Sequence, residues 1–310
     1  MPYYLGIDGG GTKTTCAVGD DSRLLATATA GPSNIVRVGE VVARESLQAS
    51  VRQACAAAGI SLDQVVRTCV GGSGAARPEL AAAVRGFLAE ILSSPVDVVG
   101  DMEIALDAAF DTGPGVIVIA GTGSIAYGRD RHGNTARAGG WGFAIGDEGS
   151  AHWIGRSAVA AVLRASDAGP DAAERLVRSD LVASFCKTWG VNSLIELARV
   201  ANAVPPPDFS ALFPAIAASN HELARQVLAD AGRELARIAV VVIRRIFADD
   251  SAPVPVAMTG SVFRHATATR EHFYNELRRV EARAEVKPEV VEPVEGALRM
   301  ARRAAADGSR

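Results

Sequence analysis

The chain has 310 residues, of which 48% are hydrophobic and 22% charged, and it carries a formal net charge of −3 at neutral pH. This length predicts one large or two medium-sized domains, and the hydrophobic fraction is sufficient to build their cores. The small negative charge argues against proteins that bind nucleic acid or membrane surfaces, and an aromatic content of 5% argues against base-stacking surfaces.

The N-terminal segment and the cysteines indicate a cytoplasmic protein. The first residues lack the basic and apolar regions of a secretory signal, and no apolar run approaches the ~20 residues of a membrane span. The cysteines lie far apart and form no C-x-x-C pair, which predicts buried thiols rather than disulfides or an iron–sulfur framework. They are Cys16, Cys55, Cys69 and Cys186.

The first third of the chain predicts strands followed by alternating strands and helices. Short runs rich in β-branched residues, separated by Gly and Asp, predict strands at residues 4–8, 14–20, 23–31, 65–72 and 94–101. Apolar residues at helical spacing predict helices at residues 38–59 and 77–92. Strands first and alternating units afterwards indicate a mixed sheet with helices packed on it.

The same order then begins again. A strand that runs into a glycine turn is predicted at residues 115–124, a hairpin at 125–140 and a helical region at about 150–248, with a long amphipathic helix at 223–246. A late strand with a Gly-Ser turn follows at 254–262, and a terminal helix at 294–305. We interpret the two halves as related α/β domains with a cleft between them.

The first glycine turn does not fit the Walker A pattern. From Gly6 the spacing reaches Gly11, but Thr12 intervenes before Lys13, and the residues that follow predict a strand rather than a helix. A glycine-rich hairpin can still present backbone N–H groups to a phosphate, and Asp8 at the strand end is placed to hold Mg²⁺ through water. An ordinary tight hairpin is the competing interpretation of this turn.

The second glycine turn, residues 121–126, matches the G-x-G-x-x-A pattern of dinucleotide-binding proteins. A helix should begin there, and a polar hairpin is predicted instead. We therefore interpret Gly121, Thr122, Gly123 and Ser124 as a second phosphate turn, with the threonine hydroxyl and backbone amides as donors.

Five motifs carry a family resemblance that covers essentially the whole chain. They are “GIDGGGTKT”, “GTGS”, “GGWGFAIGDEGS”, “MTGS” and “EPVEGALRMA”. In this order they resemble the N-acetylglucosamine kinase and BadF/BadG/BcrA/BcrD ATPase branch of the sugar kinase, Hsp70 and actin superfamily. The most specific part is “GGWG” followed by “GDEGS”.

The resemblance implies an α/β fold with two related actin-like ATPase (ribonuclease H-like) domains and an interdomain cleft. The N-terminal domain is expected at residues 1–111, and the C-terminal domain at 112–293 with a helical insertion at about 150–248. The terminal helix, at about 294–306, is expected to pack back onto the first domain.

The resemblance also implies site residues. “GGGTKT” and “GTGS” resemble the family's phosphate turns and “MTGS” its adenosine turn, which predicts contacts to ATP from Gly10, Gly11, Thr12, Lys13, Gly121, Thr122, Gly123, Ser124, Gly260 and Ser261. “VVGD” resembles the strand that presents the catalytic base, Asp101. The substrate-binding residues are predicted to be Asn34, Asp101, Gly140, Trp141 and Asp147. Ala138 departs from relatives with a polar or thiol side chain there, which bears on acceptor preference.

Several of these residues also fit ordinary structural roles. Asp101 follows a strand that the sequence predicts to be buried, where α/β proteins place ligand groups, but it is equally suited to cap the next helix. Asn34 also fits an ordinary turn. Asp147 and Glu148 are adjacent and point in different directions, so we assign only Asp147 to the sugar. Ser73 receives no role.

We predict an ATP- and Mg²⁺-dependent kinase that phosphorylates the 6-hydroxyl of N-acetylglucosamine. Glucosamine or N-acetylmuramic acid is the alternative acceptor within the family. A different class, a BadF-type ATPase that activates a dehydratase, needs cysteines that join two subunits through an iron–sulfur cluster, and the cysteine spacing disfavours it. A cytoplasmic homodimer is expected from the family.

Overall fold

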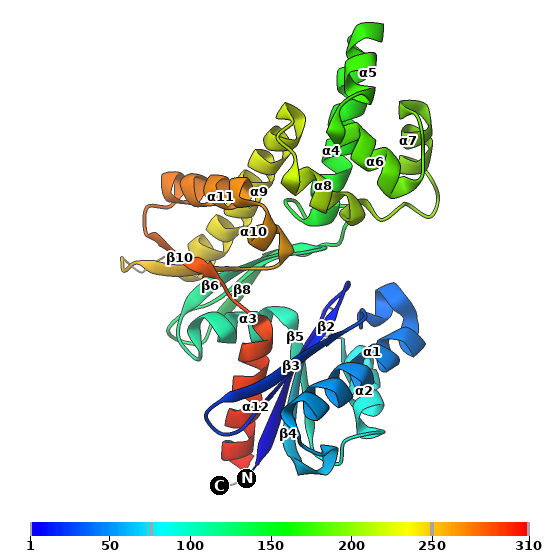
Figure 1. Cartoon of the computed structure of the whole chain (residues 1–310). Coiled ribbons are helices and arrows are strands. Elements are labelled where there is room, and N and C mark those ends of the chain that lie inside the picture. The colour runs from blue at the N-terminus through cyan, green and yellow to red at the C-terminus, as the bar shows by residue number, and fades with distance from the viewer. Residues whose placement is uncertain (1, 73, 75–76, 249–250, 309–310) are drawn as a thin grey trace. The chain divides into compact units, whose positions relative to one another are not determined.

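A computed structural model describes residues 2–72, 74, 77–248 and 251–308 of the chain. The chain forms two compact units (Figure 1). Unit 1 comprises Met1–Ile117 and Val291–Arg310, and unit 2 comprises Val118–Val290.

Unit 1 is built on a five-stranded mixed sheet. Its strands are β1 (Tyr3–Gly9), β2 (Thr14–Gly19), β3 (Leu24–Ala30), β4 (Val65–Gly72) and β5 (Val96–Gly100). They lie in the order β3-β2-β1-β4-β5. The first three are antiparallel neighbours, whereas β4 runs parallel to β1 and β5 parallel to β4. The predicted opening strands are thus confirmed as a meander with parallel strands added on one side.

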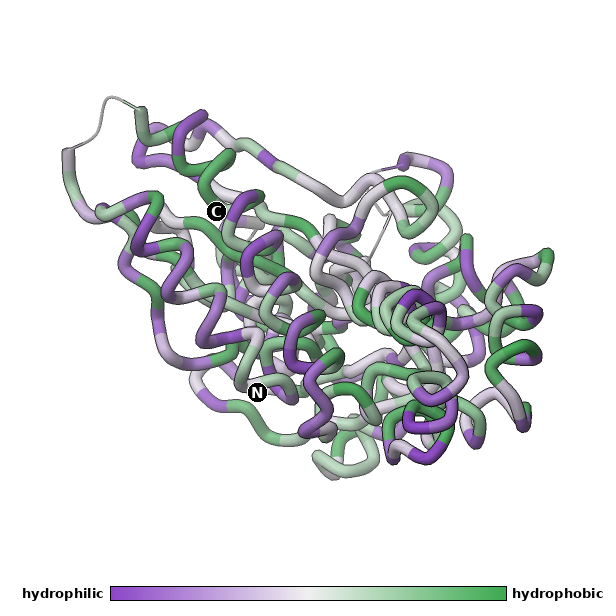
Figure 2. Tube along the Cα trace, turned by 90° about the horizontal axis from the view of Figure 1, so that it is seen from above, coloured by the Kyte–Doolittle hydropathy of each residue, from purple (hydrophilic) through white to green (hydrophobic). Residues whose placement is uncertain are grey.

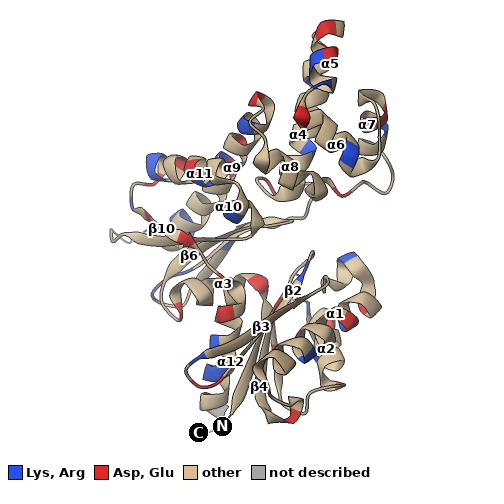
Figure 3. Cartoon of the chain, in the orientation of Figure 1, with Lys and Arg blue, Asp and Glu red and all other residues tan. Residues whose placement is uncertain are grey.

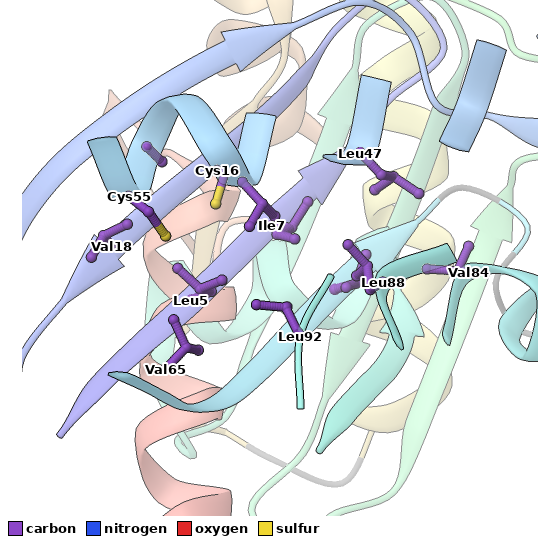
Figure 4. Packing of buried hydrophobic residues seen from close by; sticks show 13 residues of the cluster. Leu5, Ile7, Cys16, Val18, Leu47, Cys55, Val65, Val84, Leu88 and Leu92 are labelled. Atoms are coloured by element: carbon purple, nitrogen blue, oxygen red, sulfur yellow. The ribbon is translucent and has the colours of Figure 1, made fainter. Parts of the chain in front are cut away.

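Helices cover both faces of this sheet. They are α1 (Ile35–Ala58), η1 (Leu62–Gln64), α2 (Pro78–Ala89), α3 (Asp101–Phe110) and α12 (Pro293–Gly308). Leu5 and Ile7 of β1 lie in one buried cluster with Leu47 of α1 and Leu88 of α2 (Figure 4). Their neighbour Tyr4 belongs to the cluster of α3 and α12, as the alternation of side chains along a strand requires.

The C-terminal helix α12 packs against the first strand of the chain (Figure 1). A Cβ atom built on Gly6 would lie 2.2 Å from the backbone nitrogen of Leu298, so only glycine permits this approach. Arg303 of α12 forms ion pairs with Asp107 on α3 and with Asp111, which follows that helix. The two ends of the chain therefore share one core.

Unit 2 repeats this strand order. Its strands are β6 (Gly115–Ala120, which begins at the end of unit 1), β7 (Ser124–Arg129), β8 (Thr135–Gly139), β9 (Val254–Thr259) and β10 (Ala284–Val290). They lie in the order β10-β9-β6-β7-β8. β7 and β8 are antiparallel, and β10 runs parallel to β9. In both sheets the first strand of the half is central, with the meander on one side and the later strands on the other, which confirms the predicted α/β fold of two related halves.

Most of the helices lie in unit 2. They are α4 (Ala151–Ser166), α5 (Pro170–Val177), α6 (Asp180–Trp189), α7 (Leu194–Ala201), η2 (Phe209–Leu212), α8 (Phe213–Ala218), α9 (Glu222–Ile246), α10 (Ser261–His265) and α11 (Thr267–Val280). Hydrophilic and hydrophobic stretches alternate along the helices (Figure 2), and the charged residues gather on helices and loops while the strands are mostly uncharged (Figure 3).

The predicted amphipathic helix is α9, which contacts β7, β8 and α11. Its apolar positions Val227, Ala231, Leu235 and Val242 are buried, as predicted. Among the described residues, no helix is long and apolar enough to cross a membrane.

The sequence prediction missed α10, α11 and β10. In the strand β10 only Ala284 is buried, and the strand contains Pro288, which is typical of an edge strand. Its weak apolar signal explains why periodicity alone did not indicate a strand there.

Candidate functional site

The carboxyl ends of three strands form one edge of the unit 1 sheet. Gly9 of β1 pairs with Gly72 of β4, and Gly72 pairs with Gly100 of β5, so these strands end in register. Asp8 lies on β1 one residue before this row, and Asp101 follows it directly. Because β4 separates them, β1 and β5 are about 10 Å apart. The predicted metal ligand and the predicted base therefore share one edge of one sheet.

The first glycine turn connects β1 and β2 at the same edge. The amide of Gly10 donates to the carbonyl of Lys13 at 3.0 Å, and the amide of Ser33 donates to the carbonyl of Gly10 at 3.1 Å. Thr14, where β2 begins, donates its hydroxyl to the Ser33 hydroxyl at 2.8 Å. Thr12 and Lys13 are exposed. These hydrogen bonds hold one side of the turn in place, and its tip is exposed to solvent. A strand follows the turn, as predicted.

The electrostatics of this edge favour a cation. The pKa of Asp8 is raised to about 7, chiefly by desolvation and then by the charge of Asp101, and the Lys13 ammonium acts in the opposite direction. A hard divalent cation relieves such repulsion and prefers oxygen ligands. Among the described residues, no three His, Cys, Asp or Glu side chains gather into a metal cage. Asp8 is a single carboxylate beside the glycine turn, which would suit an ion that takes most of its oxygen ligands from water and phosphate.

Asp101 is the first residue of α3, and the local geometry bears on its two predicted roles. The residue in the N-cap position is Gly100, whose amide donates to the Glu103 side chain at 2.9 Å. The Asp101 carboxylate accepts from the neighbouring amide of Met102 at 2.9 Å. Desolvation raises the pKa of Asp101, and this backbone hydrogen bond lowers it. Glu103 therefore provides part of the helix capping that we predicted as an alternative role for Asp101.

Asn34 is the N-cap of α1. Its side-chain oxygen accepts from the amide of Arg37 at 3.3 Å. The cap uses the carbonyl oxygen of the side chain, so its amide nitrogen is left for another acceptor. The turn interpretation and the predicted substrate contact are compatible at this residue.

The second glycine turn connects β6 to β7 in unit 2. The amide of Gly121 donates to the carbonyl of Gly123 at 2.9 Å, and the Ser124 hydroxyl donates to the carbonyl of Glu148 at 2.7 Å. A Cβ atom built on Gly121 would meet no other described atom within 4 Å, so this side of the turn is open. Ser124 itself is buried. We infer that Gly121 marks the accessible side of the turn and Ser124 its anchored side.

Asp147 joins the “GGWG” loop to this turn. Its carboxylate accepts from the amide of Gly142 at 3.1 Å, and a Cβ atom on Gly123 would lie 2.8 Å from Oδ2. Its backbone adopts φ of +59°, and the residue is 8% exposed. Burial raises the pKa of this carboxyl, while the bond from Gly142 lowers it. The structure thus gives Asp147 a clear role in organising the loop, which the sequence did not indicate.

The loop that contains Trp141 is apolar and accessible. Trp141 is 67% exposed and Ile145 is 81% exposed, and Gly140 donates its amide to the carbonyl of Ser124 at 2.9 Å. The guanidinium of Arg137 lies 5.1 Å from the centre of the Trp141 ring. An exposed indole supported in this way can pack against the apolar face of a ligand.

The “MTGS” turn lies beside the second glycine turn. Gly260 has φ of +104°, and a Cβ atom there would lie 2.2 Å from the carbonyl oxygen of Ala120, the last residue of β6. Both strain and space therefore require glycine at this position. Ser261 begins α10 and is exposed. Ser73, to which we assign no role, lies outside the described residues.

The family model of the BadF/BadG/BcrA/BcrD ATPases matches residues 5–301. The chain belongs to the BadF/BadG/BcrA/BcrD ATPase family, as its motifs predicted.

Two relatives and one solved structure are similar to this chain along most of its length. The chain is 30% identical to an N-acetylmuramic acid/N-acetylglucosamine kinase of Clostridium acetobutylicum over 90% of either chain. It is 29% identical to an N-acetyl-D-glucosamine kinase of Dictyostelium discoideum, over 83% of this chain and 84% of that one. Its fold is similar to that of a Chromobacterium violaceum protein with a provisional assignment as N-acetylglucosamine kinase, with a TM-score of 0.74, 25% identity and coverage of 97% and 99%.

Proposed function

We propose that this protein is an ATP-dependent kinase that transfers the γ-phosphate of ATP to the 6-hydroxyl of N-acetylglucosamine. The observation that carries the proposal is the 30% identity to the Clostridium acetobutylicum kinase over 90% of both chains. The position of Asp101 at the same sheet edge as the first glycine turn supports it.

Unit 1 supplies the base and part of the phosphate site in this proposal. Asp101 accepts the proton of the 6-hydroxyl while the oxygen attacks the γ-phosphorus and ADP leaves. Gly10, Gly11, Thr12 and Lys13 bind phosphate oxygens. Asp8 would hold Mg²⁺ through water, and the ion would supply charge neutralisation at the phosphates. Asn34 binds the sugar.

Unit 2 supplies the remaining nucleotide contacts. The open side of the turn at Gly121 accommodates a phosphate against the backbone, with Thr122, Gly123 and Ser124 as the rest of that turn. The adenosine contacts come from Gly260 and Ser261. The “GGWG” loop provides sugar contacts from Gly140, Trp141 and Asp147.

We expect kcat/KM to be higher for N-acetylglucosamine than for glucosamine and glucose. The acetamide needs an apolar wall for its methyl group, and the exposed Trp141 suits this. The amides of Gly140 and Gly142 already donate to Ser124 and Asp147, so we do not assign them to the acetamide. Glucosamine and glucose lack the acetamide, so the polar groups of the site that bind it would be left without partners, and this disfavours these two sugars. Steady-state ADP release with the three sugars is the measurement. Equal or higher kcat/KM for glucosamine would contradict the specificity but not the kinase activity.

N-acetylmuramic acid is the second candidate acceptor. The name of the Clostridium acetobutylicum relative includes this sugar, which favours it over glucosamine as a further substrate. The same assay with N-acetylmuramic acid decides whether the protein accepts one amino sugar or both.

Two variants of Asp147 separate its structural role from its proposed sugar contact. Asp147→Asn keeps an acceptor for the Gly142 amide and tolerates the positive φ, so we expect a free energy of unfolding within about 1 kcal/mol of the parent. Asp147→Ala loses the acceptor for the Gly142 amide and adopts the positive φ less readily, so it should lower the free energy of unfolding by about 2–3 kcal/mol. Chemical denaturation measures this difference.

The kinetics of the stable variant then test the contact. If the carboxylate binds the sugar, Asp147→Asn should raise KM for the sugar about tenfold, because a charged hydrogen bond is weakened. An unchanged KM would restrict Asp147 to holding the loop.

The buried thiols disfavour the electron-transfer role of a dehydratase activator. A cluster that joins two subunits needs thiolates at the surface, but Cys16, Cys55 and Cys69 are buried, and desolvation raises the pKa of Cys69 to about 12. Cys186 is partly exposed. From the family resemblance alone we further propose a cytoplasmic homodimer, which sedimentation analysis would test.

A further inference from the structure

The first turn of α1 is separated from the rest of the helix by a kink. Gly39 has φ of +78° and ψ of 168°, which are not helical values, so residues 35–38 form a single turn with its own direction. Asn34 caps this turn by accepting from the amide of Arg37. The backbone of Arg37 is thereby fixed beside a proposed sugar-binding residue.

The side chain of Arg37 lies over the first glycine turn. A Cβ atom built on Gly11 would be 3.5 Å from Nη1 and 3.6 Å from Cδ of Arg37, which is ordinary van der Waals distance. Because Gly11 has no side chain, the Arg37 guanidinium lies near the backbone of the turn without a side chain between them. With Lys13 in the same turn, two cationic side chains are associated with this short segment.

We propose that Arg37 contacts the phosphoryl group that is transferred from ATP to the sugar, an inference that rests on the proposed kinase function. A guanidinium presents several N–H donors in a plane and binds phosphate oxygens in pairs. Phosphoryl transfer depends on positioning and on neutralising the charge of the transferred group, and an arginine is well suited to both.

The position of Arg37 favours the transferred group over other anions. Its backbone amide holds Asn34, which we assign to the sugar, and its guanidinium lies at the turn assigned to the phosphates. A group between sugar and phosphate turn is the one that moves from ATP to the 6-hydroxyl. A carboxylate on the sugar ring is the competing ligand, and kinetics with N-acetylglucosamine and N-acetylmuramic acid distinguish the two.

The first test is kinetic. We expect Arg37→Gln to lower kcat with N-acetylglucosamine about 10- to 100-fold, less than the largest arginine effects in phosphoryl transfer because the side chain is exposed. Arg37→Lys should recover part of the loss because it retains the charge but not the planar donors. The control is Arg44→Gln, on the same helix, which removes only an exposed ion pair with Glu90 at 3.4 Å. It should match the parent.

The second test is calorimetric and uses a non-hydrolysable ATP analogue and ADP, each with Mg²⁺. Arg37→Gln should weaken the analogue about tenfold and leave ADP unchanged, since only the analogue carries the third phosphate. Equal losses for both nucleotides, or kcat within about twofold of the parent in both Arg37 variants, would overturn the proposal. A loss confined to N-acetylmuramic acid would also overturn it, because it would assign Arg37 to the sugar carboxylate. If the parent phosphorylates no sugar, the proposed function is wrong, and the calorimetric comparison still decides the role of Arg37.

Discussion

Asp101→Asn should lower kcat for N-acetylglucosamine by at least ~10²-fold, the scale expected for a positioned general base. The amide has nearly the same shape as the carboxylate and keeps an acceptor for the Met102 amide, so the fold and the affinities for sugar and ATP should persist. Rapid-quench or coupled ADP-release kinetics measure kcat, and calorimetry measures the two affinities. Turnover within about threefold of the parent would show that Asp101 is not the base.

Asp63→Asn provides the matched control. Asp63 is an exposed residue of η1, immediately before β4, so it lies near the opposite end of that strand from the glycine row. The same change of charge there should leave kcat unaltered.

The pH profile adds an independent check on Asp101. Because desolvation raises the pKa of Asp101, the base becomes protonated, and kcat of the parent should fall, as the pH drops through this raised value. The residual rate of Asp101→Asn should lack the part of the acidic limb that comes from Asp101, while any part that comes from Asp8, whose pKa is raised to about 7, should remain.

Gly121→Val should weaken ATP binding about 10- to 100-fold, the loss expected when about 1.5–3 kcal/mol of hydrogen bonding to a charged group is blocked. The added side chain would occupy the open side of the turn, where no other described atom lies within 4 Å of a Cβ position. It should therefore exclude the phosphate without disturbing the fold. Sugar affinity should change little, and calorimetry with ATP and with sugar measures both.

Gly86→Val is the control for this substitution. Gly86 lies on α2 in unit 1, and a Cβ atom there also meets no described atom within 4 Å beyond its own helix backbone. The variant should bind ATP as the parent does. Unchanged ATP affinity in a folded Gly121→Val variant would remove this turn from the nucleotide site.

Patterns of apolar residues were sufficient to predict most of the fold. The strands of the meander, the long helix α9 and the repeated order of the two halves all follow from periodicity and from glycine stops such as Gly59, which adopts the left-handed conformation after α1. We did not predict β10, because an edge strand buries few side chains and its sequence therefore lacks a regular pattern of apolar residues.

The candidate site was predictable only in part, because motifs locate residues but do not describe their tertiary partners. Asp8, the glycine turns and Asp101 could be placed from strand ends and glycine spacing. That Asp147 holds the Gly142 amide depends on a contact across a loop and a positive φ. Arg37 comes close to Gly11 in the turn that precedes the kink at Gly39, and Gly39 looks like an ordinary helical glycine in the sequence.

The most direct test of the proposed function is the identity and stoichiometry of the products. Purified protein is incubated with Mg²⁺, ATP and N-acetylglucosamine, ADP is quantified, and the phosphorylated product is analysed by ³¹P–¹H correlation NMR. We predict equal amounts of ADP and a sugar monophosphate whose phosphorus couples to the protons at C6. ADP accompanied by inorganic phosphate, with no sugar phosphate, would contradict the assignment as a sugar kinase.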